Sequence, residues 1–229
     1  MLDKNEFRAL TEYRSALYRL LSGLYLMEVD AEQLKTLKSL SFPQVEGDSD
    51  ADLDLQQGYA LLENALSETE ENDLDELAAE YAKIFLAAGE SSGKAAFPYA
   101  SVYLDKKHYV GGGMEQKMKR LLLARGRDID PEAYRIMYDH IGLMLEYMAI
   151  LCEEQLAAEE NLKELIQEQK EFLRDNLQSW VYAFTADVVK YSKGKFYAGL
   201  ALVTSGLLKK ETEFLKETGE KYGVDINCE

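Results

Sequence analysis

The residues of this 229-residue chain that could do chemistry gather around an Asp-His pair, Asp139-His140, in its most apolar stretch. On a helix, Asp139, Gly142 and Glu146 would share one stripe, and Gly142 would leave room for a second backbone to approach. Ionisable groups are rarely buried without partners, so the pair either faces a groove or is paired inside the protein. Carboxylates beside a groove would suit an arginine guanidinium. A core histidine with structural acids explains the pattern equally well.

Other kinds of reactive site find little support in the residue types. The chain has two histidines, His108 and His140, and neither follows a Glu at the spacing of a di-iron bundle, so we expect no metal site. No dinucleotide fingerprint or nucleophile elbow occurs. Residues 88–95 resemble a phosphate-binding loop, but Ala95 replaces the hydroxyl that would hold magnesium, which favours an ordinary polar loop. We therefore expect no metal-dependent catalysis.

Composition restricts the partners. The 26 Lys+Arg residues against 42 Asp+Glu residues give a formal net charge of −16, which argues against a nucleic-acid partner and permits a cationic one. No apolar run approaches the roughly 20 residues that span a bilayer, and the first residues lack the order of a signal peptide, so we expect a cytoplasmic protein without membrane insertion. Cys152 and Cys228 are expected to be reduced thiols.

Hydrophobic periodicity and only three prolines predict helices along nearly the whole chain. We expect an all-α, single-domain bundle of about eight to eleven helices, with a hinge at 125–130 as the best candidate for a joint between its N- and C-terminal parts. Residues 87–113 are expected to form an ordered loop. The expected helices cover residues 3–27, 30–40, a segment ending near 66, 72–85 capped by Asn72, 114–124, 131–160 capped by Asp130, 161–176, 177–191 and 195–221.

Three segments together resemble the TorD/DmsD/NarJ family of redox-enzyme maturation chaperones. The order and spacing of the segments, as well as the helical pattern, agree with that family. The segments are Glu80-Tyr-Ala-Lys-Ile-Phe85, Phe97-Pro-Tyr-Ala-Ser-Val-Tyr-Leu104, and Asp139-His-Ile-Gly-Leu143 with Glu146-Tyr-Met148. The chain departs from the family where Leu86-Ala-Ala-Gly89 replaces the usual Gly-Pro-Gly.

This resemblance implies a TorD-like helical chaperone without catalysis or a cofactor of its own. Such proteins bind the twin-arginine signal peptide or the apoprotein of a molybdoenzyme catalytic subunit, and hold it in the cytoplasm until the molybdopterin cofactor is inserted. Members are monomers or exchange helices in homodimers, so either state is expected here. The family's client-binding region maps onto Phe97, Pro98, Tyr99, Ser101, Tyr103, Asp139, His140 and Glu146.

Two other functions remain open from the residues themselves. The chain could be a non-catalytic adaptor whose acidic helices dock a partner protein through exposed apolar seams. It could also be a small helical hydrolase or a nucleotide-dependent switch that uses the 88–94 loop.

Overall fold

The computed structural model of the chain describes residues 4–89, 94–105, 112–128, 136–158 and 160–222. Apart from one isolated bridge, the regular elements in these ranges are helices, so the predicted all-α class is confirmed. They are α1 (Lys4–Leu26), α2 (Ala31–Ser39), α3 (Asp50–Glu68), the 3-10 turn η1 (Glu71–Asp73), α4 (Leu74–Phe85), α5 (Ala100–Leu104), α6 (Gly113–Ala124), α7 (Ile141–Ala157), α8 (Leu162–Phe172), the π-helical η2 (Leu173–Gln178), α9 (Val181–Tyr191) and α10 (Lys195–Tyr222).

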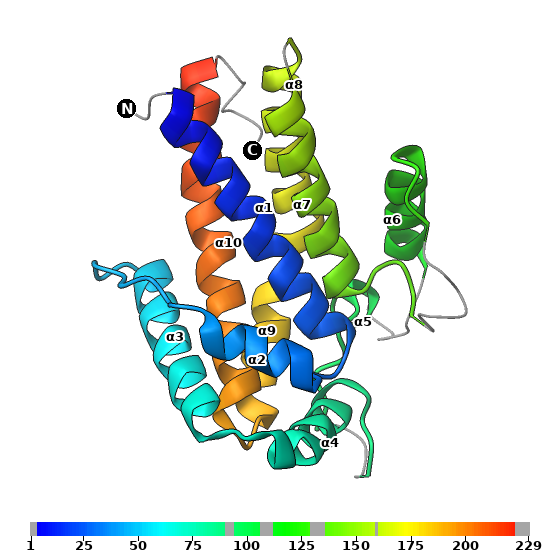
Figure 1. Cartoon of the computed structure of the whole chain (residues 1–229). Coiled ribbons are helices and arrows are strands. Elements are labelled where there is room, and N and C mark those ends of the chain that lie inside the picture. Colours follow the sequence, from blue (N-terminus) through cyan, green and yellow to red (C-terminus); the bar gives the residue numbers. More distant parts are fainter. Residues whose placement is uncertain (1–3, 90–93, 106–111, 129–135, 159, 223–229) are drawn as a thin grey trace. The chain divides into compact units, whose positions relative to one another are not determined.

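The chain folds as two compact units, of which the first comprises residues 1–26, 99–180 and 211–229. In this unit α1 packs along α7 (Figure 1). A Cβ at Gly142 would lie 2.5 Å from Cγ of Leu26 and 3.0 Å from the carbonyl oxygen of Ser22, so only glycine lets the helices come this close. The Ser22 hydroxyl donates to the Gly142 carbonyl at 2.8 Å. The room expected at Gly142 is thus occupied by α1.

A buried polar cluster ties α1 to the end of α10 inside the first unit. Nε of Arg14 donates to both carboxylate oxygens of Glu211 at 3.0 Å, and its Nη2 donates to Gln169 at 2.5 Å. Burial alone would lower the pKa of Arg14, but the carboxylate of Glu211 outweighs it and the pKa is raised. The Arg14 side chain can be buried because Glu211 neutralises its charge.

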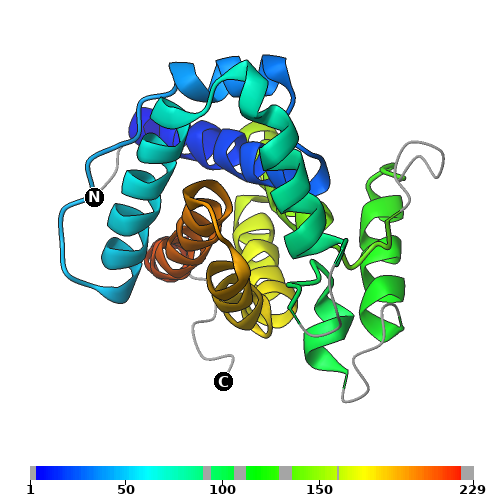
Figure 2. The same cartoon turned by 90° about the horizontal axis from the view of Figure 1, so that it is seen from below.

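The second unit comprises residues 27–98 and 181–210, with α2, α3, η1, α4, α9 and the first part of α10. Here α3 lies beside α10 (Figure 2), where a Cβ on Gly58 would come within 2.8 Å of the backbone nitrogen of Val203. Ser205 and Lys209 of α10 both bind Asp54 of α3 at 2.7 Å. Small residues and paired charges together fix this helix pair.

The helix predicted over 131–160 begins later than expected. Residues 136–140 are not helical and α7 starts at Ile141, whereas the expected cap at Asp130-Pro131 lies outside the described residues. Asp139 and His140 therefore do not stand in the middle of a helix. The cause is tertiary, because their backbone pairs with the segment around Tyr99.

Three further boundaries differ from the sequence prediction. Residues 100–104 form the short α5 instead of continuing a loop, and the backbone N–H groups of its first turn donate hydrogen bonds to Asp139, outside the helix. Asn72 lies inside η1, and the N-cap position of α4 is held by Asp73, whose side chain accepts the N–H of Glu70 and not one from α4. At η2 the amide of Asn176 donates to the Phe172 carbonyl, competing with the ordinary helical bond.

The boundaries between the two units fall at 26/27, 98/99, 180/181 and 210/211. The single domain with a hinge at 125–130 stays a prediction. Among the helices described, none is both long and apolar enough to cross a membrane.

Candidate functional site

The Asp-His segment pairs with the segment after Pro98 in the first unit. Tyr99 and His140 form an isolated antiparallel bridge, and the N–H of Ala100 donates to the carbonyl of Asp139 at 3.0 Å. Two stretches that are distant in sequence thus meet at the point where α5 and α7 begin.

The carboxylate of Asp139 accepts a hydrogen bond from the first turn of α5. Its Oδ2 accepts the backbone N–H of Ser101 at 2.9 Å, and the side chain is fully buried. A helix leaves its first N–H groups without internal partners, and a carboxylate there is also favoured by the helix dipole. Among the described residues Oδ1 has no hydrogen-bond partner. Asp139 therefore caps α5 from outside that helix.

His140 caps α7. Its Nδ1 accepts the N–H of Gly142 at 3.1 Å, and the ring of Tyr99 meets the imidazole edge-on with centroids 5.1 Å apart. Burial lowers the pKa of His140 to about 3. The ring is therefore neutral at pH 7, and because Nδ1 is an acceptor its proton is on Nε2.

The Tyr99 hydroxyl is shifted in the opposite direction. Burial, and then the negative charge of Asp139, raise the pKa of Tyr99. The phenol stays protonated at neutral pH and keeps an O–H donor. His140 and Tyr99 thus contribute uncharged hydrogen-bonding groups to the candidate site, and Asp139 contributes a carboxyl group.

Glu146 on α7 is engaged by an arginine of this chain. Arg19 of α1 donates to Glu146 at 2.6 Å and also binds Glu153 at 2.6 Å. Burial would lower the pKa of Arg19, but Glu153 and Glu146 raise it. All three side chains are partly exposed, so an incoming guanidinium could compete with Arg19 for the same carboxylates.

The other predicted positions divide between the units. Tyr103 of α5 packs its ring 5.6 Å from that of Trp180, which belongs to the same unit. Phe97 and Pro98 belong to the second unit, where Phe97 is 37% exposed and Pro98 is buried. The structure thus brings Tyr99, Ser101, Asp139 and His140 together.

Sequence reasoning did not single out Arg19 or Trp180 for the site. Arg19 reads as an ordinary polar-face residue, and its partners Glu146 and Glu153 are 127 and 134 residues away, so no local signal marks it. Trp180 is the chain's single tryptophan, which is the one signal that could have directed attention to it.

Several predicted features lie elsewhere or outside the described residues. His108, Cys228 and residues 90–93 of the 88–95 loop are not described. Cys152 is free and buried, and burial raises the pKa of its thiol to about 12, so it is a thiol at neutral pH. In the part of the chain that is described, no group of three or more His, Cys, Asp or Glu residues could hold a metal ion.

The chain is similar to known proteins over most of its length. The family "Nitrate reductase delta subunit" matches residues 48–186. Chaperone protein TorD of Shewanella pealeana is 30% identical over 219 residues, covering 92% of this chain and 93% of that protein. Chaperone protein TorD of a Psychrobacter species is 31% identical over 190 residues, covering 81% of this chain and 83% of that protein.

The chain belongs to the TorD/DmsD/NarJ family. The resemblance seen in the sequence is thereby confirmed. The family match over residues 48–186 contains all eight predicted client-binding positions, Phe97 to Glu146. For this family member, the structure adds that Asp139 and His140 act at helix starts and that Glu146 pairs with Arg19.

Proposed function

We propose that this protein is a cytoplasmic maturation chaperone for a molybdenum-dependent oxidoreductase and has no catalytic activity. It binds the precursor of the catalytic subunit, through the twin-arginine signal peptide or through the apoprotein, and holds it until the cofactor is inserted. The similarity to TorD chaperones over 92% of the chain carries this proposal. The net charge of −16 supports it, because an acidic protein steers an arginine-containing segment toward itself.

We propose that all eight predicted residues serve client binding, six of them in the first unit and Phe97 and Pro98 in the second. The buried Asp139, His140 and Ser101 hold the backbone of the first unit in place, and the buried Pro98 does so in the second. The accessible Phe97, Tyr99, Tyr103 and Glu146 offer two phenols, an apolar ring and a carboxylate. Aromatic faces and a carboxylate complement both parts of a signal peptide, its arginines and its apolar stretch.

Capture of the client tests the proposal that the protein binds a molybdoenzyme precursor. The tagged protein is co-expressed with a molybdoenzyme catalytic subunit from the same genome and isolated by its tag. A stable complex that is lost when the two signal-peptide arginines become glutamines supports the signal-peptide form. A complex that survives this change supports binding of the apoprotein. No complex with any such subunit would overturn the proposal and favour the adaptor function.

The surface is tested with a matched pair of exposed apolar residues. Phe97→Ala removes a ring from the proposed surface, and Leu53→Ala removes an apolar side chain that is 52% exposed on α3. We expect Phe97→Ala to weaken client binding about tenfold and Leu53→Ala to leave it unchanged, as for an anchor residue against a neutral one. Equal affinities in both variants would remove Phe97 from the surface.

A further inference from the structure

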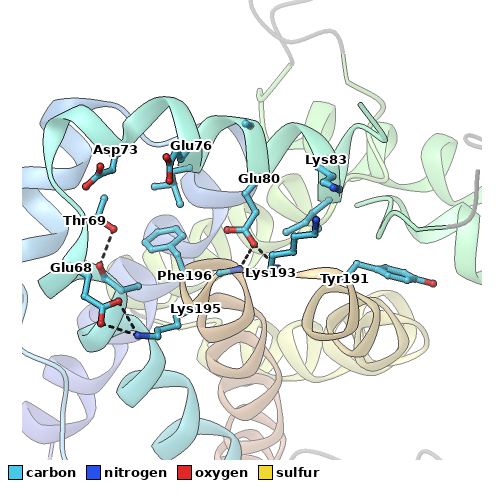
Figure 3. A pocket seen from close by; sticks show the side chains of 15 residues that line it. Glu68, Thr69, Asp73, Glu76, Glu80, Lys83, Tyr191, Lys193, Lys195 and Phe196 are labelled. Carbon is cyan, nitrogen blue, oxygen red and sulfur yellow. Dashed lines mark hydrogen bonds and ion pairs between the residues drawn. The ribbon is translucent and has the colours of Figure 1, made fainter. Parts of the chain in front are cut away.

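The second unit contains a pocket that the proposed surface does not use. Its volume is about 710 Å³, within the roughly 300–1,000 Å³ typical of ligand pockets. It lies between the end of α3, the segment η1–α4 and the turn from α9 to α10 (Figure 3). Apolar side chains contribute to its lining, namely Ala65, Leu77, Ala79, Ile84 and Phe196.

Polar contacts hold the walls of this pocket together. Oε1 of Glu80 on α4 accepts the backbone N–H groups of Lys193 at 2.8 Å and Gly194 at 2.7 Å, just before α10 begins. A Cβ at position 194 would lie 2.6 Å from Oε2 of Glu80, so a larger residue there would have to displace this carboxylate. Lys195 binds Glu68 at the end of α3 at 2.8 Å. The pocket is therefore formed before a ligand arrives, which lowers the entropic cost of binding.

One end of the pocket is acidic. Residues 63–76 contain seven acidic residues and no Lys or Arg, and three of these acids line the pocket: Glu68, Asp73 and Glu76. Lys195 neutralises Glu68, and Asp73 accepts the N–H of Glu70. The side chain of Glu76 is exposed, and among the described residues no hydrogen bond or ion pair is found for it. This end therefore offers negative charge to a cation.

The opposite end has a different character. Figure 3 shows Lys83, Lys193 and Tyr191 toward this end, with Glu80 between them and the acidic end. Lysine ammonium groups can donate hydrogen bonds to backbone carbonyls. A polypeptide segment would then lie with its basic side chain at Asp73 and Glu76, its apolar side chains over the lining, and its carbonyls toward the lysines.

We infer that this groove binds a basic, then apolar, segment of the client polypeptide, with an arginine or lysine held between Asp73 and Glu76 and the next apolar side chain over Leu77 and Phe196. The inference rests on the proposed function and adds to it a second contact site, in the second unit of the protein. Charge complementarity selects a cationic segment, and the apolar lining selects a segment over a free cation.

A matched pair of charge reversals tests the inference. Glu76→Lys changes a pocket residue, whereas Asp75→Lys makes the same change at the neighbouring exposed acid, which does not line the pocket. The probe is a fluorescent synthetic peptide with two consecutive arginines followed by a short Leu/Ala stretch, read by fluorescence anisotropy. Both reversals alter the long-range field equally, so we expect about tenfold weaker binding for Glu76→Lys and no more than about twofold for Asp75→Lys.

A steric pair tests the groove without touching its charges. Ala79→Trp fills the pocket from an exposed position on α4, and Ala60→Trp adds the same bulk at an exposed position of α3 that does not line it. Ala79→Trp should abolish the component of peptide binding that Glu76→Lys weakens, while circular dichroism shows that the helices remain. Ala60→Trp should bind like the unmodified protein.

The outcomes separate the inference from the proposed function. Unchanged peptide binding in both Glu76→Lys and Ala79→Trp would overturn the groove and leave the proposed chaperone intact. Equal weakening in Glu76→Lys and Asp75→Lys, with no effect of Ala79→Trp, would also overturn it, because the field alone would then explain the affinity. Absence of peptide binding by the unmodified protein would overturn the groove, whereas the client capture described above would still decide the chaperone function.

Discussion

Ser101 and Asp139 are 38 residues apart in the sequence and are joined by a buried hydrogen bond of 2.9 Å, from the backbone N–H of Ser101 to Oδ2 of Asp139. With the bond from Ala100 to the Asp139 carbonyl, it fixes the start of α5 against the residue that precedes His140. The Asp-His pair therefore holds two helix starts together. Any role it has in client binding acts through the position of Tyr99 and its neighbours.

This arrangement predicts different costs for two substitutions of Asp139. Asp139→Ala leaves the buried N–H of Ser101 without its acceptor, which should lower the free energy of unfolding by about 1–3 kcal/mol. Asp139→Asn keeps an oxygen acceptor at the same place and should cost clearly less. Urea denaturation measures both. Equal losses in the two variants would show that the hydrogen bond is not what Asp139 contributes.

The sequence predicted most helices because each carries its own local signal. Apolar spacing placed 3–27, 30–40 and 195–221 within one or two residues of α1, α2 and α10, and Asp30 supplies the capping box of α2. These signals lie within one or two turns of each helix and need no tertiary information.

The site was harder to predict because its geometry is made by contacts between distant residues. The apolar run around Asp139-His140 is compatible with a helix, but in the structure these two residues bond the segment 99–101 and His140 caps α7, so the helix starts at Ile141. Gly142 was correctly expected to admit a second backbone. The burial of Arg14 could not be predicted, because its partner Glu211 is 197 residues away, a separation that no periodicity argument can detect.

The buried neutral His140 predicts a pH dependence of stability. Its pKa is about 3 in the folded protein against 6.5 for the free side chain, so below pH 6.5 the unfolded chain binds a proton that the folded protein does not. The unfolding free energy should therefore fall as the pH falls, and this one group should contribute about 1 kcal/mol between pH 6.5 and 5.5.

Two variants isolate that contribution. Asn can accept the Gly142 N–H as a helix cap but does not titrate, so His140→Asn should flatten the pH dependence measured by urea unfolding. His108→Asn serves as the control for removing a histidine. If His108→Asn flattens the dependence as much as His140→Asn does, the assignment to His140 is wrong.

Neutralising one partner of the buried Arg14–Glu211 ion pair should strongly lower the free energy of unfolding. Glu211→Gln leaves the buried guanidinium without a counter-charge, and we expect a loss of about 3–5 kcal/mol in the free energy of unfolding. The double variant Arg14→Met/Glu211→Leu removes both charges and should lose less than Glu211→Gln alone. As a control, Glu12→Gln breaks the exposed pair with Arg8 and should change the free energy by no more than about 0.5 kcal/mol. A double variant that loses more than the single one would contradict this account.

Replacing Ala87 with glycine should stabilise the protein, because Ala87 is a non-glycine residue in the left-handed region, with φ of 54°. It lies at the end of α4, where the N–H groups of Leu86 and Ala88 both donate to the Ala82 carbonyl at 3.0 Å. The left-handed conformation costs a residue with a Cβ about 1–2 kcal/mol. Glycine avoids this cost but loses about 0.5–1 kcal/mol through its greater freedom in the unfolded chain.

Ala87→Gly should therefore raise the free energy of unfolding by up to about 1.5 kcal/mol, as measured by urea denaturation. The same substitution inside α4, Ala79→Gly, should lower it by about 1 kcal/mol, because there the backbone is ordinary right-handed helix. The two Ala→Gly changes therefore have opposite expected signs within nine residues of one segment, and the difference comes from φ alone. If both substitutions lower the free energy of unfolding, the left-handed conformation at position 87 does not cost the alanine any free energy.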